Sequence, residues 1–449
     1  LATDNSPRFV GSRICFDRCE NRNKEGGRTL VYVISKTGQP IMPTENHAKV
    51  RILLKSGKAK VVKRTPFTIQ LTGTSKTFTQ EVTLGVDAGS KHVGLSASTA
   101  KKELFSAELR PRNDVVDLMS SRRALRRSRR NRTMRYRQAR FLNRVHFKHK
   151  WWLAPSVEVK IWNHIQGIRF VMKLLPVKTI RVETAEFDLQ RLKALEAGEP
   201  VPVGTDYQLG EMYGQYNVRQ YVLHRDGYTC QCCGAHGTDK KPVKLHVHHL
   251  ETRKTGGDAP DNLITLCEDC HTGYHAGTVA LPITKRRRKS TRDAAFMGIM
   301  RKTLLERLRN MFPDANICST YGYITKYWRE KKNIVKTHTS DAFVIAKNFD
   351  AERLDRSLLI VPKRQHNRQI HKCKINKGGM RKLNQTPKFV FGYQLFDRVM
   401  CMGQEGFVFA RRSSGGFDIR KLSGEKIKPN INYKKLKRLE SRNTLLVSY

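Results

Sequence analysis

The sequence predicts a multidomain α/β protein, and three observations support this prediction. The chain has 449 residues, and at roughly 100–200 residues per domain this length suggests about two to four domains. The segment VTLGVDAGSKHVG at residues 82–94 predicts a buried strand that ends on an acid, a glycine-containing turn and a second strand. Two Cys-x-x-Cys pairs within residues 230–270 predict a separate domain that folds around a metal ion.

The charge balance indicates a polyanionic partner. Lysine and arginine number 86 and aspartate and glutamate 39, which gives a formal net charge of +47. Such an excess destabilises a compact protein by self-repulsion unless a polyanion is bound, and nucleic acid is the first candidate. It excludes an ordinary metabolic enzyme and an acidic disordered scaffold. A membrane surface is the alternative, but no apolar run approaches the roughly 18–20 residues of a spanning helix, so we expect no membrane partner.

The cysteines favour a reducing, cytoplasmic location. Five of the ten lie between residues 230 and 270, and the others are scattered. A secreted disulfide framework would be shorter and denser in cysteine. No short apolar stretch with a cleavage site follows the N-terminus either.

The N-terminal part divides into a leader and a small basic module. Residues 1–29 are polar, charged and without periodicity, so we expect a disordered leader. Residues 30–75 predict a β-α-β module with a strand, a helix closed by Gly57 and a returning pair of strands. The helix places Val50, Leu53 and Leu54 on one face.

An arginine-rich segment follows the first strands. Residues 122–144 contain eleven arginines and no acid, among strong helix formers and without proline or glycine. A solvated charged face would have interleaved acids, so we expect a helix that contacts nucleic acid. Its expected contacts are Arg122, Arg123, Arg126, Arg127, Arg129, Arg130, Arg132, Arg135, Arg137, Arg140 and Arg144.

The remaining elements alternate in type. An amphipathic helix leads into a strand, KTIRVETAEFD, that carries Glu183. The segment ICSTYGYITKYWREKK, at residues 317–332, predicts a strand followed by a turn, and HTSDAFVIAKNF predicts a helix with Asp341 in its first turn. Residues 363–388 are a basic linker, and residues 389–449 predict a small β-rich barrel or sheet.

The two Cys-x-x-Cys pairs predict a structural zinc site. Cys230, Cys233, Cys267 and Cys270 supply four thiolates for one tetrahedral ion, and Cys232 is left over. A bare zinc ribbon is the alternative. However, His246, His248, His249, Asn262, His271 and His275 lie between or just after the pairs, and a structural ribbon does not need so many histidines.

This combination resembles the HNH, or ββα-metal, nuclease motif. The resemblance implies that His249 is the general base, that His248 is a ligand of a catalytic Mg²⁺, and that Asn262 orients the loop carrying the base. It also implies that His271 is the second metal-side histidine, with His275 as the alternative. The cation would neutralise charge on the scissile phosphate and the leaving oxygen.

Three acids form a second candidate site. Asp87 and Glu183 each follow β-branched strand residues, and His338 lies one helical turn before Asp341. A strand, an aspartate, a glycine turn and a second strand begin an RNase H-like fold, and the order of the acids matches such a site split by an inserted domain. Clustered carboxylates binding two Mg²⁺ ions would support in-line attack on a phosphodiester.

Together these motifs resemble the IscB family, transposon-associated RNA-guided DNA endonucleases related to the large CRISPR effector with HNH and RuvC domains. The segment Gln39–Pro43 resembles the family's PLMP sequence, with Ile41 in place of leucine. The resemblance covers about residues 30–449 and implies an RNase H-like RuvC core split by an inserted HNH domain. The implied segments are the leader (1–29), the PLMP-like module (30–75), RuvC segment I (76–118), the arginine-rich bridge helix (119–150), RuvC segment II (151–205), the HNH domain (206–290), RuvC segment III (291–362) and a basic linker with a β-rich domain that reads the target-adjacent motif (363–449).

The resemblance also implies a division of labour. A structured guide RNA would bind the protein and pair with one strand of target double-stranded DNA. The HNH domain would cut that strand, and the RuvC core would cut the displaced strand. We expect one protein chain per ribonucleoprotein, in the prokaryotic cytoplasm and at the nucleoid when acting on DNA.

Two other functions compete with this one. A guide-independent HNH/RuvC DNase, of the homing or junction-resolving type, would explain both metal sites but not the PLMP-like module or the basic tail. A catalytically retired RNA- or DNA-binding protein would explain the charge, but all expected catalytic residues are present.

Overall fold

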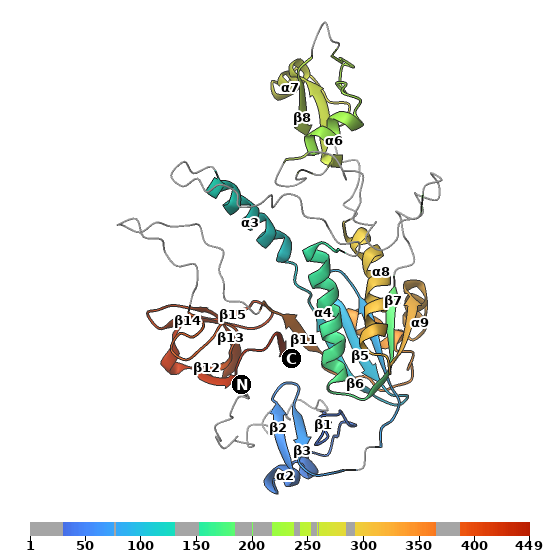
Figure 1. The fold of residues 1–449 in the computed structure, drawn as a ribbon, viewed down its shortest axis with the longest axis vertical. Helices are drawn as coiled ribbons and strands as arrows, with labels where there is room; N and C mark the ends of the chain where they lie inside the picture. Colours follow the sequence, from blue (N-terminus) through green and yellow to red (C-terminus); the bar gives the residue numbers. More distant parts are fainter. Residues whose placement is uncertain are drawn as a thin grey trace. The chain divides into compact units, whose positions relative to one another are not determined.

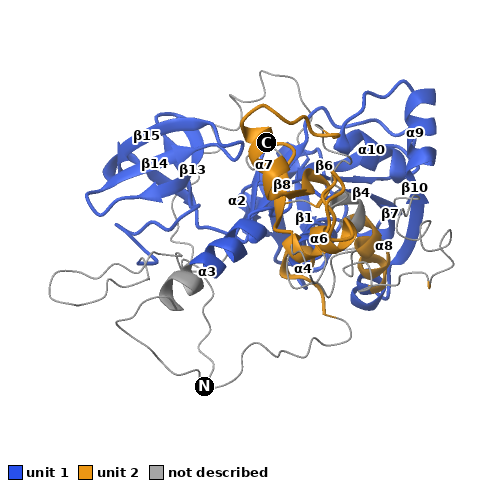
Figure 2. Cartoon of the chain, turned by 90° about the horizontal axis from the view of Figure 1, so that it is seen from above, with its two compact units in different colours: residues 1–136, 159–184, 307–449 blue, residues 137–158, 185–306 orange. Residues whose placement is uncertain are grey.

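The computed structural model describes most of the chain outside its N-terminus and several internal segments (Figure 1). The described residues are 30–75, 78–130, 152–184, 200, 218–237, 243–252, 258, 260–283, 292–364 and 387–449. The predicted leader at 1–29 and most of the predicted basic linker at 363–388 therefore lie outside them. The chain forms two compact units: residues 1–136, 159–184 and 307–449 make unit 1, and residues 137–158 and 185–306 make unit 2 (Figure 2).

The largest sheet among the described residues belongs to unit 1 and has seven strands in the order β10-β7-β4-β5-β6-β11-β17. Neighbours from β4 to β6 are antiparallel, whereas β7 runs parallel to β4 and β10 runs parallel to β7. The strands are β4 (Val82–Ala88), β5 (Val93–Ser98), β6 (Glu103–Leu109), β7 (Val177–Thr184), β10 (Asn316–Tyr321), β11 (Leu358–Pro362) and β17 (Leu445–Ser448).

Two helices cover opposite faces of this sheet. On β5, Leu95 approaches helix α4 (Pro155–Met172) at Gly167, whereas the adjacent Gly94 approaches helix α10 (His338–Ile345). Successive strand residues face opposite sides, so α4 and α10 pack on different faces. Gly85 and Gly94 let α10 come close, because a Cβ at either position would lie within 2.0 Å of a backbone oxygen of α10.

The helices confirm most of the sequence predictions and correct one. Helices α3 (Val115–Arg130), α4 and α10 form where helices were expected, and α8 (Arg292–Met311) precedes β10. The predicted turn after β10 was wrong, because residues Gly322–Lys331 form the ten-residue helix α9. Thr325 and Arg329, one turn apart on α9, are both buried. The buried partners of these polar side chains come from other strands and helices, so local sequence did not reveal them.

The N-terminal module has the predicted β-α-β character. Its sheet has the order β1-β3-β2, and its core contains Val31, Val50, Ala59 and Ile69. The predicted helix forms and is followed by Gly57 at a positive φ of 70°, a backbone conformation that glycine adopts readily. The elements are β1 (Tyr32–Ile34), α2 (His47–Lys55), β2 (Ala59–Lys63) and β3 (Thr68–Leu71).

The C-terminal residues form a five-stranded sheet in the order β15-β14-β13-β12-β16, around Val399, Val408, Phe417 and Ile419. Its strands are β12 (Arg398–Cys401), β13 (Gln404–Arg411), β14 (Gly416–Arg420), β15 (Lys426–Asn432) and β16 (Lys437–Glu440). The last strand, β17, does not belong to it but pairs with β11 in the large sheet. The prediction that residues 389–449 form one small barrel or sheet was therefore wrong for their last strand.

Unit 2 contains a β-β-α arrangement. Strands β8 (Leu245–His249) and β9 (Leu263–Cys267) pair antiparallel, and helix α7 (Glu268–His275) follows β9 directly. Helix α6 (Val218–Arg225) precedes them, and a short 3-10 helix, η2 (Pro260–Asn262), leads into β9. Within the part of the chain that the structure describes, no helix combines the length and apolar character needed to cross a membrane.

Candidate functional site

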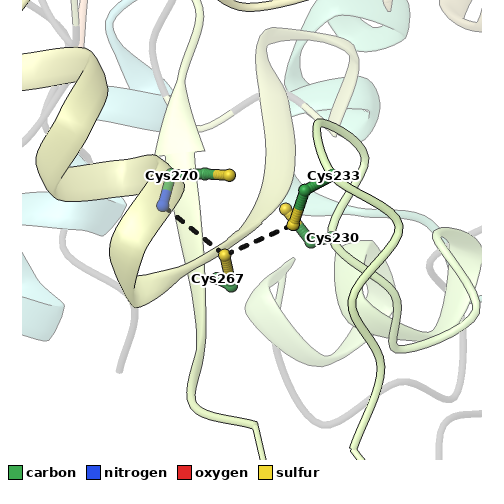
Figure 3. Close-up of side chains that lie close together, drawn as sticks. All are labelled: Cys230, Cys233, Cys267 and Cys270. Atoms are coloured by element: carbon green, nitrogen blue, oxygen red, sulfur yellow. Dashed lines mark hydrogen bonds between the residues drawn. The ribbon is translucent and has the colours of Figure 1, made fainter. Parts of the chain in front are cut away.

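Four cysteines form the first cluster of unit 2 (Figure 3). The sulfurs of Cys230, Cys233, Cys267 and Cys270 all lie within 4.8 Å of one another, and those of Cys233 and Cys267 are 3.7 Å apart. A tetrahedral zinc ion with Zn–S bonds of about 2.3 Å separates its sulfurs by about 3.8 Å. The cluster therefore has the dimensions of a structural zinc site.

The charges within this cluster also fit a bound cation. Burial raises the pKa of Cys270, and the neighbouring thiols raise it further. At Cys230 burial acts in the same direction, but hydrogen bonds involving the backbone of Cys233 and Cys267 outweigh it and lower the pKa to about 6. Four thiolates this close would repel one another unless a cation neutralised them. Cys232 is not one of the four clustered cysteines, and its thiol donates to the Ala280 carbonyl oxygen at 3.7 Å.

Three histidines form a second cluster in unit 2. His248 comes from β8, while His271 and His275 lie one turn apart on α7. Their ligand atoms all lie within 4.8 Å of one another. Burial, with the charges of His271 and His275, lowers the pKa of His248 to about 4, so its imidazole is neutral at pH 7. Its buried Nε2 has no hydrogen-bond partner among the described residues, as expected for a metal ligand.

The composition of this cluster changes the sequence prediction for its metal. The sequence predicted Mg²⁺ held by His248 with His271, or alternatively with His275, but both helix histidines lie beside His248. Magnesium prefers oxygen ligands, whereas three imidazole nitrogens suit transition ions such as zinc or nickel. The histidine cluster therefore matches a transition ion better than it matches Mg²⁺.

His249 and Asn262 do not belong to the histidine cluster and have partners of their own. The Nε2 atom of His249 is 2.9 Å from Asp258 Oδ1, a partner that the sequence did not reveal. Asn262 is fully buried. Its Oδ1 accepts the Glu251 N–H at 2.8 Å, and its Nδ2 donates to the Glu251 carbonyl oxygen at 3.2 Å. Asn262 thus holds the backbone two residues after His249.

The three predicted carboxylates come together in unit 1. Val86 and Val182 pair in parallel register on β4 and β7, so the next residues, Asp87 and Glu183, lie side by side. Asp341 reaches them from α10: burial raises the pKa of Asp341, and the charge of Asp87 raises it further. Burial likewise raises the pKa of Glu183, with added repulsion from Asp87 and Asp341. The three acids therefore repel one another, a condition that a divalent cation would relieve.

His338 lies at the edge of the carboxylate cluster. Its Nδ1 is 2.7 Å from Asp87 Oδ2, and this hydrogen bond raises the pKa of His338. Its ring stacks on that of His92 with centroids 5.1 Å apart. His92 Nδ1 is in turn 2.7 Å from Glu108 Oε1. Thus His92 packs against the ring of His338, and Glu108 contacts His92. The sequence did not single out either residue.

Helix α9 contributes two more residues to the carboxylate cluster. The sequence did not reveal them, because a turn was predicted for this segment. Thr325 Oγ1 donates to Glu183 Oε2 at 2.6 Å. Arg329 Nε is 3.2 Å from Asp341 Oδ1, with only 10% and 16% of the two side chains exposed. That Asp341 oxygen is buried and has no hydrogen-bond partner among the described residues. Clustered carboxylates fit a hard cation such as Mg²⁺, and Arg329, which forms an ion pair with this oxygen, partly neutralises them.

The arginine-rich segment is described only at its start. Helix α3 ends the described part at Arg130, and the side chains of Arg122 and Arg123 are exposed. The side chains of Arg126, Arg127, Arg129 and Arg130, and all of Arg132, Arg135, Arg137, Arg140 and Arg144, lie outside the described residues.

Comparison with known families matches two regions. A family model described as RRXRR protein matches residues 31–210, and a model described as HNH endonuclease matches residues 230–277. The first name fits the sequence RRSRR at residues 126–130. The HNH match contains both metal-ligand clusters of unit 2, so the β-β-α arrangement is an HNH endonuclease domain.

Individual proteins each match less than half of the chain. Anaredoxin from Nostoc sp. (strain PCC 7120) is 32% identical over 72 residues, which cover 16% of this chain and 88% of that protein. A Streptococcus thermophilus Cas9, solved in complex with AGGA PAM, matches with 14% identity and a TM-score of 0.28, over 43% of this chain and 26% of its own. The Type II-C Cas9 enzyme from Actinomyces naeslundii matches with 15% identity and a TM-score of 0.14, over 46% of this chain and 29% of its own. This chain thus spans less than a third of either Cas9 chain, and TM-scores this low do not show a common overall fold.

Proposed function

Because the chain belongs with the IscB- and Cas9-like HNH nucleases, we propose that it is an RNA-guided endonuclease that cuts both strands of DNA. One observation carries this proposal: an HNH domain and a separate carboxylate cluster occur in the same chain. Two chemically different phosphodiesterase sites suit two strands of opposite polarity. A single-site nuclease would not need both.

The strand order supports a RuvC-type core. Strands β6-β5-β4-β7-β10 run as an antiparallel trio continued by two parallel strands, which is the RNase H-like arrangement. Unit 2 interrupts the sequence between β7 and β10. This matches a core split by an inserted HNH domain, the arrangement that the sequence predicts.

In the HNH domain, His249 acts as the general base that takes a proton from the attacking water. Asp258, 2.9 Å from its Nε2, orients the ring, and Asn262 fixes the backbone that follows it. His248, His271 and His275 would hold a divalent ion, which stabilises charge on the phosphate and the leaving oxygen. Cys230, Cys233, Cys267 and Cys270 would hold zinc for folding.

In the carboxylate cluster, Asp87, Glu183 and Asp341 would hold Mg²⁺, which supports in-line displacement at a phosphodiester. His338 is placed to move a proton at Asp87, because the two are 2.7 Å apart. Thr325 fixes one oxygen of Glu183, so the remaining oxygen stays available to a ligand. This site would cut the displaced strand, and the HNH domain would cut the strand paired with guide RNA.

The nucleic-acid partners follow from the charge. A heteroduplex of about 20 base pairs carries about 40 phosphates, and the net charge of the chain is +47. We propose that a structured guide RNA binds the N-terminal module, the arginine-rich helix and the C-terminal sheet. Base pairing then reads the target sequence, and the protein reads backbone shape and a short flanking motif.

The test combines RNA dependence with strand-specific cleavage. RNA that co-purifies from the native locus is sequenced and used to design a supercoiled target plasmid. With that RNA we expect double-strand cleavage, while Asp87→Ala and His249→Ala should each leave a nick, on opposite strands. The exposed residues Asp314 and His236 belong to neither cluster, so Asp314→Ala and His236→Ala serve as matched controls.

Two outcomes would contradict the proposal. Cleavage of a defined site by RNA-free protein would indicate a guide-independent DNase. If the wild-type ribonucleoprotein binds its target with Mg²⁺ or Mn²⁺ present but cuts neither strand, the chain is a binding protein.

A further inference from the structure

Helix α9 presents one face to the carboxylate cluster. Thr325 donates to Glu183, and Arg329 pairs with Asp341. At the start of the helix, a Cβ on Gly322 would lie only 3.0 Å from Glu183 Oε1. The backbone around Gly322 therefore borders the carboxylates directly, and residues on either side of it flank the cluster.

Exposed aromatic side chains lie at the start of α9, on both sides of Gly322, and continue along its solvent side. Tyr321, Tyr323 and Tyr327 are 44%, 59% and 57% exposed. The rings of Tyr321 and Tyr323, on the two sides of Gly322, are nearly parallel, with centroids 6.0 Å apart and planes 10° apart. Tyr327 follows Tyr323 by one helical turn. An exposed group of large aromatic residues marks an interaction surface.

Basic side chains continue this surface along the helix. Lys331, one turn beyond Tyr327, places its ammonium 5.7 Å from the centroid of that ring. Lys326 is exposed, and its contact with Glu330, the one acid of α9, is a loose 3.9 Å. Aromatic rings followed by lysines are the combination that binds single-stranded nucleic acid, by base stacking and by attraction of the backbone.

We propose that Tyr321, Tyr323 and Tyr327, with Lys326 and Lys331, form a stacking surface that guides a single strand into the carboxylate cluster. A single strand is the occupant because the bases of a duplex already stack on one another and cannot offer their faces to tyrosine. The carboxylates at one end of the surface supply the chemistry for a phosphate. This inference rests on the proposed function, in which that cluster cuts the displaced DNA strand.

The first measurement locates the contact without requiring cleavage. The full-length protein with its guide RNA is mixed, in Ca²⁺, with a single-stranded DNA oligonucleotide that carries 5-iodouracil, and heparin is added to compete with purely electrostatic binding. After irradiation, crosslinked peptides are identified by mass spectrometry. We expect crosslinks within residues 321–331, which Asp87→Ala should retain. Absence of crosslinks there, with crosslinks elsewhere on the chain, would overturn the proposal.

The second measurement separates stacking from folding. In a His249→Ala background only the carboxylate cluster cuts, so the rate reports on that site alone. Loss of one stacked base contact should lower kcat/KM about fivefold or more for Tyr323→Ala and Tyr327→Ala, mainly through KM. Tyr323→Phe and Tyr327→Phe keep a ring and should stay near the starting value. Tyr228→Ala, which removes an exposed tyrosine from unit 2, is the control.

The outcomes distinguish the two proposals. Equal losses for the alanine and phenylalanine variants would overturn the stacking surface, since the ring would not matter. Unchanged kinetics in the alanine variants would overturn it as well. If the wild-type protein cuts neither strand yet crosslinks at residues 321–331, the stacking surface stands and the proposed endonuclease function fails.

Discussion

The two candidate active sites are assembled in different ways. The cysteine and histidine clusters of unit 2 come from residues 230–275, which form a turn after α6, the β8–β9 hairpin and helix α7. The carboxylate cluster takes Asp87, Glu183 and Asp341 from two strands and a helix that are far apart in the sequence. Within each of these two clusters, the ligand atoms lie within 4.8 Å of one another. The carboxylates are instead positioned by the seven-stranded sheet and by α10.

Because the sites are assembled differently, we expect them to be sensitive to different changes. The small HNH domain has a limited apolar core, so its fold should depend on zinc. The carboxylate cluster should tolerate loss of metal but not a change in how α10 packs on the sheet. Three substitutions test this comparison, and their expected effects decrease in the order given.

The largest effect is expected from Cys267→Ser. Removal of one thiolate should release zinc, whose binding contributes about 10–16 kcal/mol to the folding of small zinc domains. We expect zinc content near zero by plasma mass spectrometry, rapid proteolysis within residues 218–283, and loss of HNH cleavage. Cleavage by the carboxylate cluster should persist. Cys232→Ser is the matched control, because Cys232 lies outside the four-cysteine cluster and its loss should leave zinc in place.

The second-largest effect is expected from Gly94→Ala, which changes how α10 packs on the sheet and leaves all three acids in place. Gly94 pairs with Asp87 across β4 and β5, and a Cβ there would lie 1.8 Å from the His338 carbonyl oxygen. Gly94→Ala must therefore push α10 away from the sheet, at a cost of roughly 1–3 kcal/mol or more. We expect cleavage by this site to fall at least about tenfold, since small misplacements of catalytic groups are costly.

The control for this substitution is Gly73→Ala, because a Cβ at Gly73 meets nothing within 4 Å. HNH cleavage and zinc content are measured alongside, so that general misfolding is recognised. If Gly94→Ala cuts both strands at wild-type rates, the packing of α10 does not position the acids.

The smallest effect is expected from Arg329→Gln. Breaking a buried ion pair costs about 3–5 kcal/mol, and less is expected here because both side chains keep some exposure. The melting temperature without metal should fall, whereas Mn²⁺ should bind about tenfold more tightly, or ~1.4 kcal/mol, once the competing positive charge is gone. Calorimetric titration measures that affinity directly. Arg329→Lys keeps the charge and should keep the wild-type affinity; a tighter Mn²⁺ complex in that variant would contradict the electrostatic explanation.

Several features were predictable because they depend on neighbours in sequence. Helix α2 and its closing Gly57, the apolar strand β4 ending near Asp87, and the first turn of α10 with Asp341 all follow local patterns. Each Cys-x-x-Cys pair lies within four consecutive residues, so its spacing is a local pattern. Local patterns set residue spacing along a helix or strand, so sites built within one motif can be identified before the fold is known.

Other features depended on tertiary contacts. The segment after β10 forms helix α9 rather than a turn, and its Thr325 and Arg329 are buried against Glu183 and Asp341. Strand β17 leaves the C-terminal sheet for the large one. Glu183 lies 142 residues before Thr325, β11 lies more than 80 residues before β17, and Asp341 belongs to a different helix from Arg329. The pattern within each segment therefore does not reveal these partners.

By itself, the sequence determined the chemistry available to this protein: four thiols, a histidine-rich hairpin, three acids that follow or begin regular elements, and a net charge of +47. The tertiary structure decided which of these groups meet. It placed His275 beside His248 together with His271, set Arg329 against Asp341, and left Tyr321, Tyr323 and Tyr327 exposed at the start and on the solvent side of α9. The physical reason is that side-chain identity is local, whereas burial and distance between remote segments depend on how strands and helices pack.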